Sequence, residues 1–258
     1  MTTALITGAS SGIGEKFARA LAGRSMNLVL VARGTEKLER LATELETGYN
    51  IATEIVVQDL TVPHAGRLVF DTVASKGITV DLLVNNAGFG DYGLFSDRDV
   101  NRQLEMIQLN IAVLVELTHL FIRPMLERRS GGIINVASIA AFQPLPYLSV
   151  YAATKAFVLS FSEAIWAENK DKGVKILALC PGPTESEFFR IARFPAAMNE
   201  KNGRLFPAEK VVEKALIALE NHRSNVVTGG FTNQAIVNLS RFFPREALVS
   251  LIEKQFKV

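Results

Sequence analysis

The most informative stretch of this sequence is Thr7-Gly8-Ala9-Ser10-Ser11-Gly12-Ile13-Gly14, which directly follows the apolar run Ala4-Leu5-Ile6. The run predicts a short buried strand, and apolar residues recurring at three- and four-residue steps after Gly12 predict a helix. The glycines therefore lie on a strand-to-helix turn, where free backbone N–H groups and the positive end of a helix dipole attract a pyrophosphate. An ordinary tight turn is the alternative, because the spacing G-x-x-x-G-x-G differs from the common G-x-G-x-x-G fingerprint.

Strands and helices alternate along the rest of the chain. Strands are predicted at residues 3–7, 27–32, 51–57, 81–84, 131–137, 174–180 and 225–228. Helices are predicted at residues 12–23, 35–47, 63–76, 99–129, 149–171 and 207–221. The runs 28–31 and 133–136 are nearly continuous in apolar residues, as is typical of parallel strands covered on both faces. The sequence thus predicts an α/β fold, a Rossmann-like doubly wound parallel sheet in a single domain spanning residues 1–258.

Composition narrows the class of protein. With 258 residues, 48% hydrophobic content and a formal net charge of +2, the chain fits a globular enzyme and shows no charge bias toward nucleic acid. The single cysteine, Cys180, excludes an intrachain disulfide and agrees with a reducing compartment, so we expect a cytoplasmic protein. The three histidines lack metal-ligand spacing, so we expect no metal site. We also expect no membrane-spanning segment, because the longest apolar stretch, residues 111–126, carries acidic and basic side chains.

A second cluster is Tyr151-Ala152-Ala153-Thr154-Lys155, with Ser138 thirteen positions upstream. Tyr151 and Lys155 are four residues apart, so on a helix they share one face. A free phenol has a pKa of about 10, and a cation alongside favours the phenolate and brings that pKa closer to neutrality. Ser138 follows the fifth predicted strand, where it is placed to hydrogen-bond a substrate oxygen. An ordinary pair on a helix face is the alternative interpretation of Tyr151 and Lys155.

Taken together, the two clusters resemble the short-chain dehydrogenase/reductase family in its compact single-domain form, over about residues 1–190. The residues that match the family's cofactor turn are Thr7, Gly8, Gly12, Ile13 and Gly14. The run Asn85-Asn86-Ala87-Gly88 matches the family's Asn-Asn-Ala-Gly run after the fourth strand. The family's other cofactor contacts are matched by Asp59 and Leu60 near the adenine, by Asn86, Ala87 and Gly88 of that run, and by Pro181, Gly182 and Thr184 near the nicotinamide. The family's four catalytic residues are matched by Asn110, Ser138, Tyr151 and Lys155.

The resemblance implies an enzyme that holds a nicotinamide dinucleotide and moves a hydride. It implies that Tyr151 acts as the acid or base and that Asn110 reaches Lys155 through a water in a proton relay. Tyr151 and Lys155 are also expected to contact the cofactor, as are Ser10 and Ser11 of the glycine-rich turn.

The end of the second predicted strand bears on the choice of cofactor. NAD specificity usually needs an acidic residue there, but the strand ends in Ala32 followed by Arg33. A guanidinium suits the 2′-phosphate of NADP(H), and the Ser11 hydroxyl is placed to add a contact. A solvated loop charge is the alternative for Arg33, and Ser11 stands where some NADP-dependent relatives have a basic residue. We therefore predict NADPH or NADP⁺ as the cofactor, in preference to NADH.

Apolar and aromatic side chains dominate the segments around the predicted catalytic residues. These side chains are Phe89, Tyr92, Phe95, Phe142, Leu145, Pro146 and Tyr147, together with Phe188, Phe189, Ile191, Phe194, Leu205 and Phe206. The last six lie in the long non-periodic stretch 181–206, which we interpret as a substrate lid. This lining favours a hydrophobic ketone or aldehyde, or the matching alcohol, over a sugar phosphate. The alternatives are an epimerase or dehydratase, and a non-catalytic protein that senses NADP(H).

The chain continues beyond Gly230 as a predicted C-terminal helical extension, residues 231–258. One apolar stripe comprises Ala235, Ile236, Leu239, Phe242 and Phe243, and a second, after Pro244, comprises Leu248, Leu251, Ile252 and Phe256. We expect both stripes to be buried near the lid, because apolar helix faces need a covering surface. By resemblance, such an extension is typical of a branch that acts on lipid-like ketones and alcohols. The family's helices that carry Asn110 and Tyr151 commonly form a dimer face, so we predict a homodimer.

Overall fold

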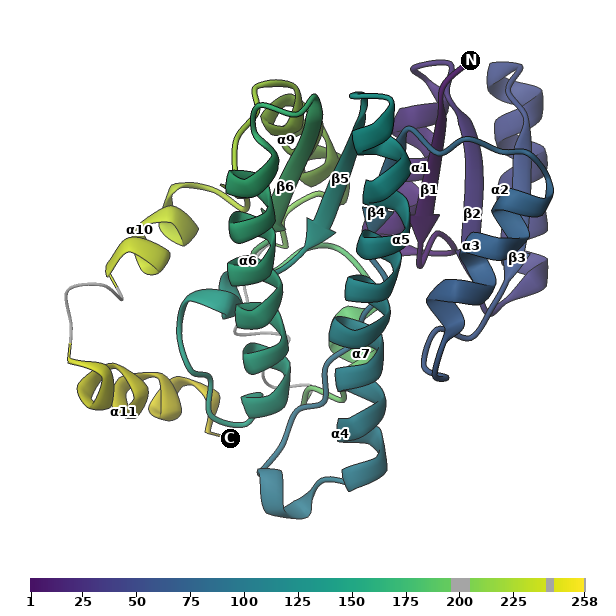
Figure 1. Cartoon of the computed structure of the whole chain (residues 1–258). Helices are drawn as coiled ribbons and strands as arrows, with labels where there is room; N and C mark the ends of the chain where they lie inside the picture. Colours follow the sequence, from purple (N-terminus) through teal and green to yellow (C-terminus); the bar gives the residue numbers. More distant parts are fainter. Residues whose placement is uncertain (196–204, 240–243, 258) are drawn as a thin grey trace.

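The computed structural model of the chain describes residues 1–195, 205–239 and 244–257 (Figure 1). Its centre is a seven-stranded parallel sheet with the strand order β3-β2-β1-β4-β5-β6-β7. The strands are β1 (Thr3–Thr7), β2 (Asn27–Ala32), β3 (Thr53–Val57), β4 (Leu82–Asn85), β5 (Gly131–Val136), β6 (Val174–Cys180) and β7 (Asn225–Val227). The predicted doubly wound parallel sheet is confirmed, and the strand ends differ from the prediction by at most two residues.

Helices cover both faces of the sheet, as Figure 1 shows. They are α1 (Gly12–Ala22), α2 (Thr35–Tyr49), α3 (Ala65–Ser75), α4 (Val100–Ile107), α5 (Val113–Glu127), α6 (Ser149–Asn169), α7 (Phe188–Ile191), α9 (Ala208–Glu220), α10 (Phe231–Leu239) and α11 (Arg245–Phe256). On β1, Ala4 and Ile6 face the layer of α1, α2 and α9, whereas Leu5 faces the layer of α3 and α5. This alternation along one strand buries both faces of the sheet, as parallel sheets require.

The single helix predicted for residues 99–129 is interrupted at its centre. A π-helical turn, η2 (Gln108–Ala112), joins α4 to α5 and carries Asn110. Periodicity predicts one continuous helix because a π-turn adds only one residue to a turn and leaves the apolar pattern on either side intact. Such turns are frequent at functional sites, since the widened turn re-aims a side chain.

The helix Val100–Glu127, taken as one unit, is long and apolar enough to cross a membrane by length and composition. Our estimate that residues 111–126 are too polar is therefore not supported by hydropathy alone. In this fold Leu117, Phe121 and Met125 are buried against the sheet, in the same layer as α3. A core helix passes the same compositional test, so the test by itself does not place this helix in a bilayer.

The ends of the predicted lid, residues 181–206, lie side by side. Thr184 and Phe206 form an isolated parallel bridge, Glu185 N donates to Phe206 O at 3.0 Å, and Phe206 N donates to Pro183 O at 2.9 Å. Between these ends the chain forms the short helix α7, and residues 196–204 lie outside the described part. Loops whose two ends lie close together are frequently functional.

The C-terminal extension contains the two predicted helices, but their buried faces differ from the predicted stripes. In α10 the buried side chains are Asn233 and Val237, whereas Ile236 is 38% exposed. In α11 the buried face is formed by Leu248, Ile252 and Phe256, whereas Leu251 is 58% exposed. Phe242, Phe243 and the side chain of Leu239 lie outside the described part. The stripes were assigned from hydropathy alone, and hydropathy does not show which side of a terminal helix meets the protein.

Candidate active site

The glycine-rich turn lies where the order of the strands reverses, between β1 and β4. The hydroxyl of Thr7, at the end of β1, accepts hydrogen bonds from the backbone N–H groups of Asn86 and Ala87, both at 3.0 Å. In return, Asn86 Nδ2 donates to Thr7 O at 2.9 Å and to Gly8 O at 3.3 Å. The turn after β1 and the segment after β4 thus brace each other at a topological switch point, where doubly wound sheets bind their ligands.

The backbone of the turn has a shape that side chains would prevent. Gly8 has φ of +66°, and a Cβ on Gly14 would lie 2.2 Å from Gly8 O and 2.6 Å from Asn86 Nδ2. Ser11 precedes α1 without a side-chain cap, and neither its hydroxyl nor that of Ser10 has a hydrogen-bond partner within the described ranges. Gly12, Ile13 and Gly14 present the free first N–H groups of α1 beside these hydroxyls. This arrangement fits a pyrophosphate, which needs close backbone approach and convergent donors.

Arg33 and Asp59 lie at the ends of the neighbouring strands β2 and β3. Arg33 is exposed, and no ion pair or hydrogen bond of its side chain occurs in the part of the chain that the structure describes. Burial raises the pKa of Asp59, but hydrogen bonds from Thr61 and the charge of Arg33 outweigh it and hold that pKa below its ordinary value. Asp59 Oδ1 accepts from both Thr61 N and Thr61 Oγ1, and Leu60 is buried in the core. Arg33 is therefore an exposed cation without a hydrogen-bond partner among the described residues, whereas the Asp59 carboxylate shapes the turn.

The four predicted catalytic residues come together from three parts of the chain. Asn110 lies on η2, Ser138 follows β5, and Tyr151 and Lys155 lie on α6. All four are buried, with exposed fractions between 1% and 9%. Ser138 Oγ accepts from Ala140 N at 3.1 Å, and Lys155 Nζ lies 5.8 Å from the centre of the Tyr151 ring. The structure thus brings together the whole predicted catalytic group.

Asn110 is held in place by three hydrogen bonds. Its Oδ1 accepts from Phe89 N at 3.2 Å, and its Nδ2 donates to Phe89 O and to Thr154 Oγ1, both at 3.0 Å. A Cβ on Gly88 would lie 2.9 Å from Asn110 Oδ1 and 3.4 Å from Lys155 Nζ, so both groups flank this glycine. Thr154, the partner of Asn110, was not predicted from the sequence, although it lies between Tyr151 and Lys155 on the same helix. The water-mediated relay through Asn110 stays a prediction.

Burial dominates the protonation of the catalytic pair. It raises the pKa of the Tyr151 phenol to about 12, against the lowering effect of its hydrogen bond with the Ser138 side chain. It lowers the pKa of the Lys155 ammonium to about 8, against the raising effect of Cys180. The expectation that Lys155 brings the pKa of Tyr151 toward neutrality is therefore wrong here. The Lys155 ammonium instead donates to Val136 O at 2.8 Å, and desolvation penalises both charged forms.

The segment Pro181–Thr184 is braced by the C-terminal extension. Thr184 Oγ1 donates to Gly182 O at 2.8 Å, and Gly182 N donates to Thr228 O at 3.3 Å. Asn233 of α10 packs so closely that a Cβ on Gly182 would lie 1.9 Å from Asn233 Nδ2. The predicted nicotinamide-orienting residues Pro181, Gly182 and Thr184 therefore form one ordered turn, and their support from Asn233 was not visible in the sequence.

An aromatic cluster covers Tyr151. The Phe188 ring of α7 lies 5.1 Å from the Tyr151 ring, and Tyr92 lies 4.9 Å from Phe194. The buried Ile252 of α11 belongs to the same cluster, and the Tyr92 hydroxyl donates to Phe256 O. Also packed in or against the cluster are Phe89, Leu145, Leu148, Tyr147 and Leu248. Helices α7 and α11 thus both contribute side chains to the cluster that contains Tyr151, and closure of the pocket by the C-terminal extension stays a prediction.

Several side chains proposed for the pocket lie elsewhere. Phe95 is 64% exposed and Ile191 is 41% exposed. Phe142 packs against a different cluster, beside Cys180, and Phe206 packs against the layer of α1 and α9. The assignments of Phe142 and Phe206 are wrong, because proximity along the chain to a catalytic residue does not determine where a side chain packs. Those of Phe95 and Ile191 stay predictions.

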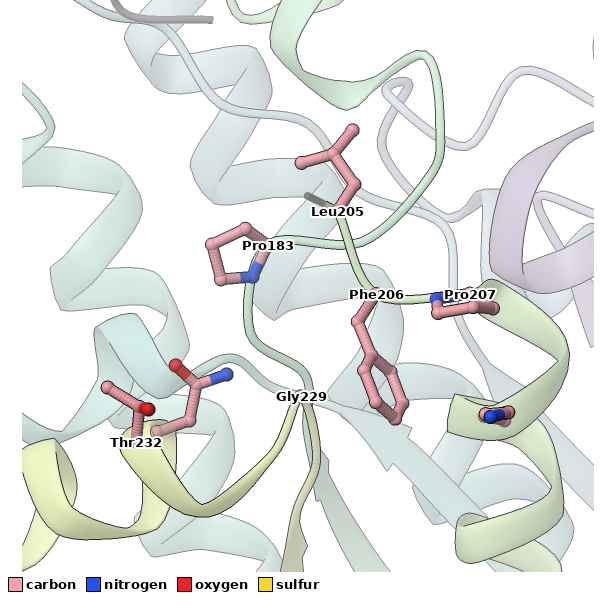
Figure 2. A pocket seen from close by; sticks show the side chains of 8 residues that line it. Pro183, Leu205, Phe206, Pro207, Gly229 and Thr232 are labelled. Carbon is pink, nitrogen blue, oxygen red and sulfur yellow. The ribbon is translucent and has the colours of Figure 1, made fainter. Parts of the chain in front are cut away.

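A separate cavity of about 520 Å³ lies between the two ends of the lid, α9 and the start of α10 (Figure 2). Pro183, Phe206 and Thr232 contribute to its wall, and it shares no residue with the cluster around Tyr151. Within the described residues there is no group of three or more His, Cys, Asp or Glu side chains suited to a metal ion. The candidate active site is therefore the region between the glycine-rich turn and Tyr151.

Comparison with known proteins identifies the class. The family model described as short chain dehydrogenase matches residues 2–193, and the chain belongs to this family. Among curated relatives, the very-long-chain 3-oxoacyl-CoA reductase of Anas platyrhynchos is 34% identical over 198 residues, which cover 74% of this chain and 62% of that protein. The chain thus spans less than two thirds of that relative's length.

Solved structures share the fold over nearly the whole chain. A short-chain dehydrogenase from Sphingobium yanoikuyae in complex with NADPH has a TM-score of 0.83 and 28% identity, and the match covers 97% of this chain and 96% of that one. A 7beta-hydroxysteroid dehydrogenase has a TM-score of 0.87 and 25% identity over the same shares of the two chains.

Proposed function

We propose that this protein is an NADP(H)-dependent oxidoreductase that transfers a hydride between the nicotinamide and a hydrophobic ketone or aldehyde, or the matching alcohol. The observation that supports this proposal most is the convergence of Asn110, Ser138, Tyr151 and Lys155, all buried, beside a glycine-rich turn at the strand-order reversal. No single motif requires this reaction, but a proton donor beside a dinucleotide cradle is the arrangement that carbonyl reduction needs.

In the proposed reaction the bound cofactor supplies or accepts the hydride. Tyr151 Oη donates the proton to the carbonyl oxygen during reduction, and its raised pKa keeps the phenol protonated at neutral pH. Ser138 Oγ holds the same oxygen by a hydrogen bond. Lys155, with its ammonium between Val136 O and the Gly88 side of the site, holds the cofactor and restores the proton of Tyr151. Asn110 positions this group through Thr154 and Phe89.

The substrate class follows from the cover over Tyr151. The Phe188 ring faces the Tyr151 ring, and Tyr92 and Ile252 belong to the same apolar cluster, which favours a bulky apolar carbonyl compound over a small polar one. The names of two similar proteins, a very-long-chain 3-oxoacyl-CoA reductase and a 7beta-hydroxysteroid dehydrogenase, refer to large lipid-like substrates. We therefore propose a long-chain acyl or polycyclic ketone as the substrate.

NADP(H) is the proposed cofactor because Arg33 is a free cation at the end of β2, with the buried Ala32 before it. A guanidinium there favours the 2′-phosphate, and no carboxylate at that position accepts from a ribose hydroxyl. The NADPH complex of the similar Sphingobium yanoikuyae enzyme supports the same choice.

The test is a panel of long-chain 3-oxoacyl thioesters, steroid ketones and short aldehydes, assayed with NADPH and with NADH by nicotinamide absorbance. Net oxidation of NADPH with bulky apolar ketones is expected. Conversion of substrate without net NADPH consumption would instead identify an epimerase or dehydratase. Tight NADPH binding without turnover of any compound would overturn the catalytic proposal in favour of a cofactor-sensing protein.

We further propose that residues 1–258 act as one domain in a cytoplasmic homodimer. The helices that the family resemblance assigns to the dimer face expose apolar side chains, namely Val100, Leu104 and Ile107 on α4 and Phe157 on α6. Light scattering of the purified protein tests this assembly, since a monomer or a tetramer would contradict it. Fractionation of cells that express the tagged protein tests the location.

A further inference from the structure

The buried carboxylate of Asp91 is the centre of an ionic cluster that the proposed chemistry does not use. Its side chain is completely buried in the loop after β4. Three guanidinium groups approach it: Arg102 Nε at 3.1 Å, Arg98 Nε at 3.4 Å and Arg193 Nη1 at 3.9 Å. Gln103 Nε2 donates to Asp91 Oδ2 at 2.8 Å. One carboxylate thus binds side chains from residues 98–103, at and before the start of α4, and Arg193, which follows α7.

Arg102 connects this cluster directly to the backbone of the lid. While its Nε donates to Asp91, its Nη2 donates to the carbonyl oxygen of Ile191, the last residue of α7, at 2.8 Å. Tyr92, the residue after Asp91, donates its N–H to Ala192 O at 2.8 Å. The last carbonyls of a helix lack intrahelical partners, so these donors fasten the end of α7 to the loop after β4.

This fastening determines where Phe188 lies. α7 is only one turn long, so a shift at Ile191 moves its first residue, Phe188, with it. The Phe188 ring packs over Gly90, where an added Cβ would lie 3.0 Å from its Cζ, and faces the Tyr151 ring at 5.1 Å. The segment Gly90–Tyr92 therefore packs against α7 and holds the Phe188 ring against the Tyr151 phenol.

We propose that Asp91 is a positioning residue that latches α7 closed over the active site, and that Arg102 transmits its effect to the lid. The proposal rests on the proposed function, because closure matters only if substrate binds beside Tyr151. Removing the Arg102 guanidinium takes a close cationic partner from the completely buried Asp91 carboxylate, so the closed arrangement should depend on both residues.

The sharpest variant is Arg102→Lys. Lysine keeps the positive charge near Asp91, but its single ammonium does not reproduce the fork that reaches Asp91 and the Ile191 carbonyl together. Asp91→Asn is the second variant, since it removes the charge and keeps the size. The matched control is Arg67→Lys on α3, where Arg67 pairs with Asp71 in an exposed ion pair.

The first measurement is hydrogen exchange in the full-length protein without substrate. In both variants we expect the N–H groups of Tyr92, Ile191 and Ala192 to exchange at least about tenfold faster, while core strands such as β5 stay unchanged. The second measurement is kinetic. The KM for a bulky ketone should rise about tenfold with a smaller change in kcat, and the Kd for NADPH should stay within about twofold, as expected when substrate enclosure alone is lost.

Unchanged exchange at these three N–H groups in both variants would refute the latch. A uniform loss of protection across the sheet in both variants would show a general structural role and also refute it. The exchange measurement needs no turnover, so failure of the wild-type protein to reduce any carbonyl compound would count against the proposed function and leave the latch to be judged separately.

Discussion

The two sides of the candidate active site are built in different ways. On the side of β1 and β4, the cradle consists of backbone held by Thr7 and Asn86, and its contacts leave no room for a methyl group at Gly14. On the side of α7 and α11, the cover consists of side chains such as Phe188 and Ile252 that pack against Tyr151. A backbone cradle tolerates few sequences, whereas an aromatic cover can change in size and keep its apolar character. The backbone cradle suits a cofactor that does not vary, and the aromatic cover suits a substrate that differs from one related protein to the next.

The largest expected effect lies at the boundary between the two sides. Tyr151→Phe removes only the hydroxyl and should lower kcat by roughly 10²–10⁴, the usual contribution of a positioned acid. NADPH affinity and the thermal midpoint should stay close to wild type, because the ring still packs against Phe188. Steady-state kinetics and a binding titration measure both quantities. Activity within a few-fold of wild type would remove Tyr151 from the catalytic role.

Gly14→Ala tests the narrow tolerance of the backbone cradle. The new methyl group would meet Gly8 O at 2.2 Å, so the turn must shift and NADPH binding should weaken by about 100-fold, the equivalent of an overpacking cost of about 3 kcal/mol. Gly48→Ala is the control, because an added Cβ there meets no atom within 4 Å. Calorimetric titration with NADPH measures the difference. Equal affinities of the two variants would show that the cradle is not the cofactor site.

The pH dependence of the free energy of unfolding tests the lowered pKa of Lys155. The folded-state pKa of Lys155, about 8, lies below its ordinary value, so between pH 8 and about 10.5 the unfolded chain binds more protons than the folded one. The free energy of unfolding should therefore rise through this window, by about 3 kcal/mol from this group. The rise should be missing in Lys155→Met. Urea titrations of both proteins at each pH measure it, and parallel curves for the two would contradict the assignment.

Arg33→Ala tests the selective part of the cofactor side. NADPH should bind about 1.5–3 kcal/mol more weakly and NADH should be little changed, because only the 2′-phosphate loses a charged hydrogen-bond partner. Ala32→Asp combined with Arg33→Ala should invert the preference by adding an acceptor for the ribose hydroxyl. Arg40→Ala, in the exposed part of α2, is the control. An equal loss for both cofactors would indicate a folding defect instead.

The smallest effect is expected on the aromatic side. Ile252→Ala removes apolar surface from the cover, so the KM for a bulky ketone should rise about fivefold, the equivalent of about 1 kcal/mol. Small aldehydes and NADPH should be unaffected. The neighbouring Leu251→Ala is the matched control, because Leu251 is 58% exposed on the same helix. If both variants behave alike, α11 does not shape the substrate pocket.

The sequence predicted the sheet and the main helices because these depend on local patterns, namely nearly continuous apolar runs for the strands and three- and four-residue steps for the helices. The four catalytic positions came from the resemblance to a family, and only the four-residue spacing of Tyr151 and Lys155 placed two of them on one helix face. It did not predict the π-turn under Asn110 or the bonds of that residue to Thr154 and Phe89. Those hydrogen bonds join residues far apart in the chain, and the periodicity within one helix does not predict such contacts.

The sequence by itself determined the class of fold and predicted that the glycine-rich segment lies on a strand-to-helix turn. Apolar runs and glycine spacing are local features, so they constrain the backbone whatever side chains pack against it. Only the tertiary structure decided that α11 covers Tyr151 with Ile252 and not with Leu251, and that burial, not Lys155, governs the pKa of the phenol. Both outcomes depend on contacts between residues far apart in the chain, because desolvation and packing are properties of the surroundings and not of the residue itself.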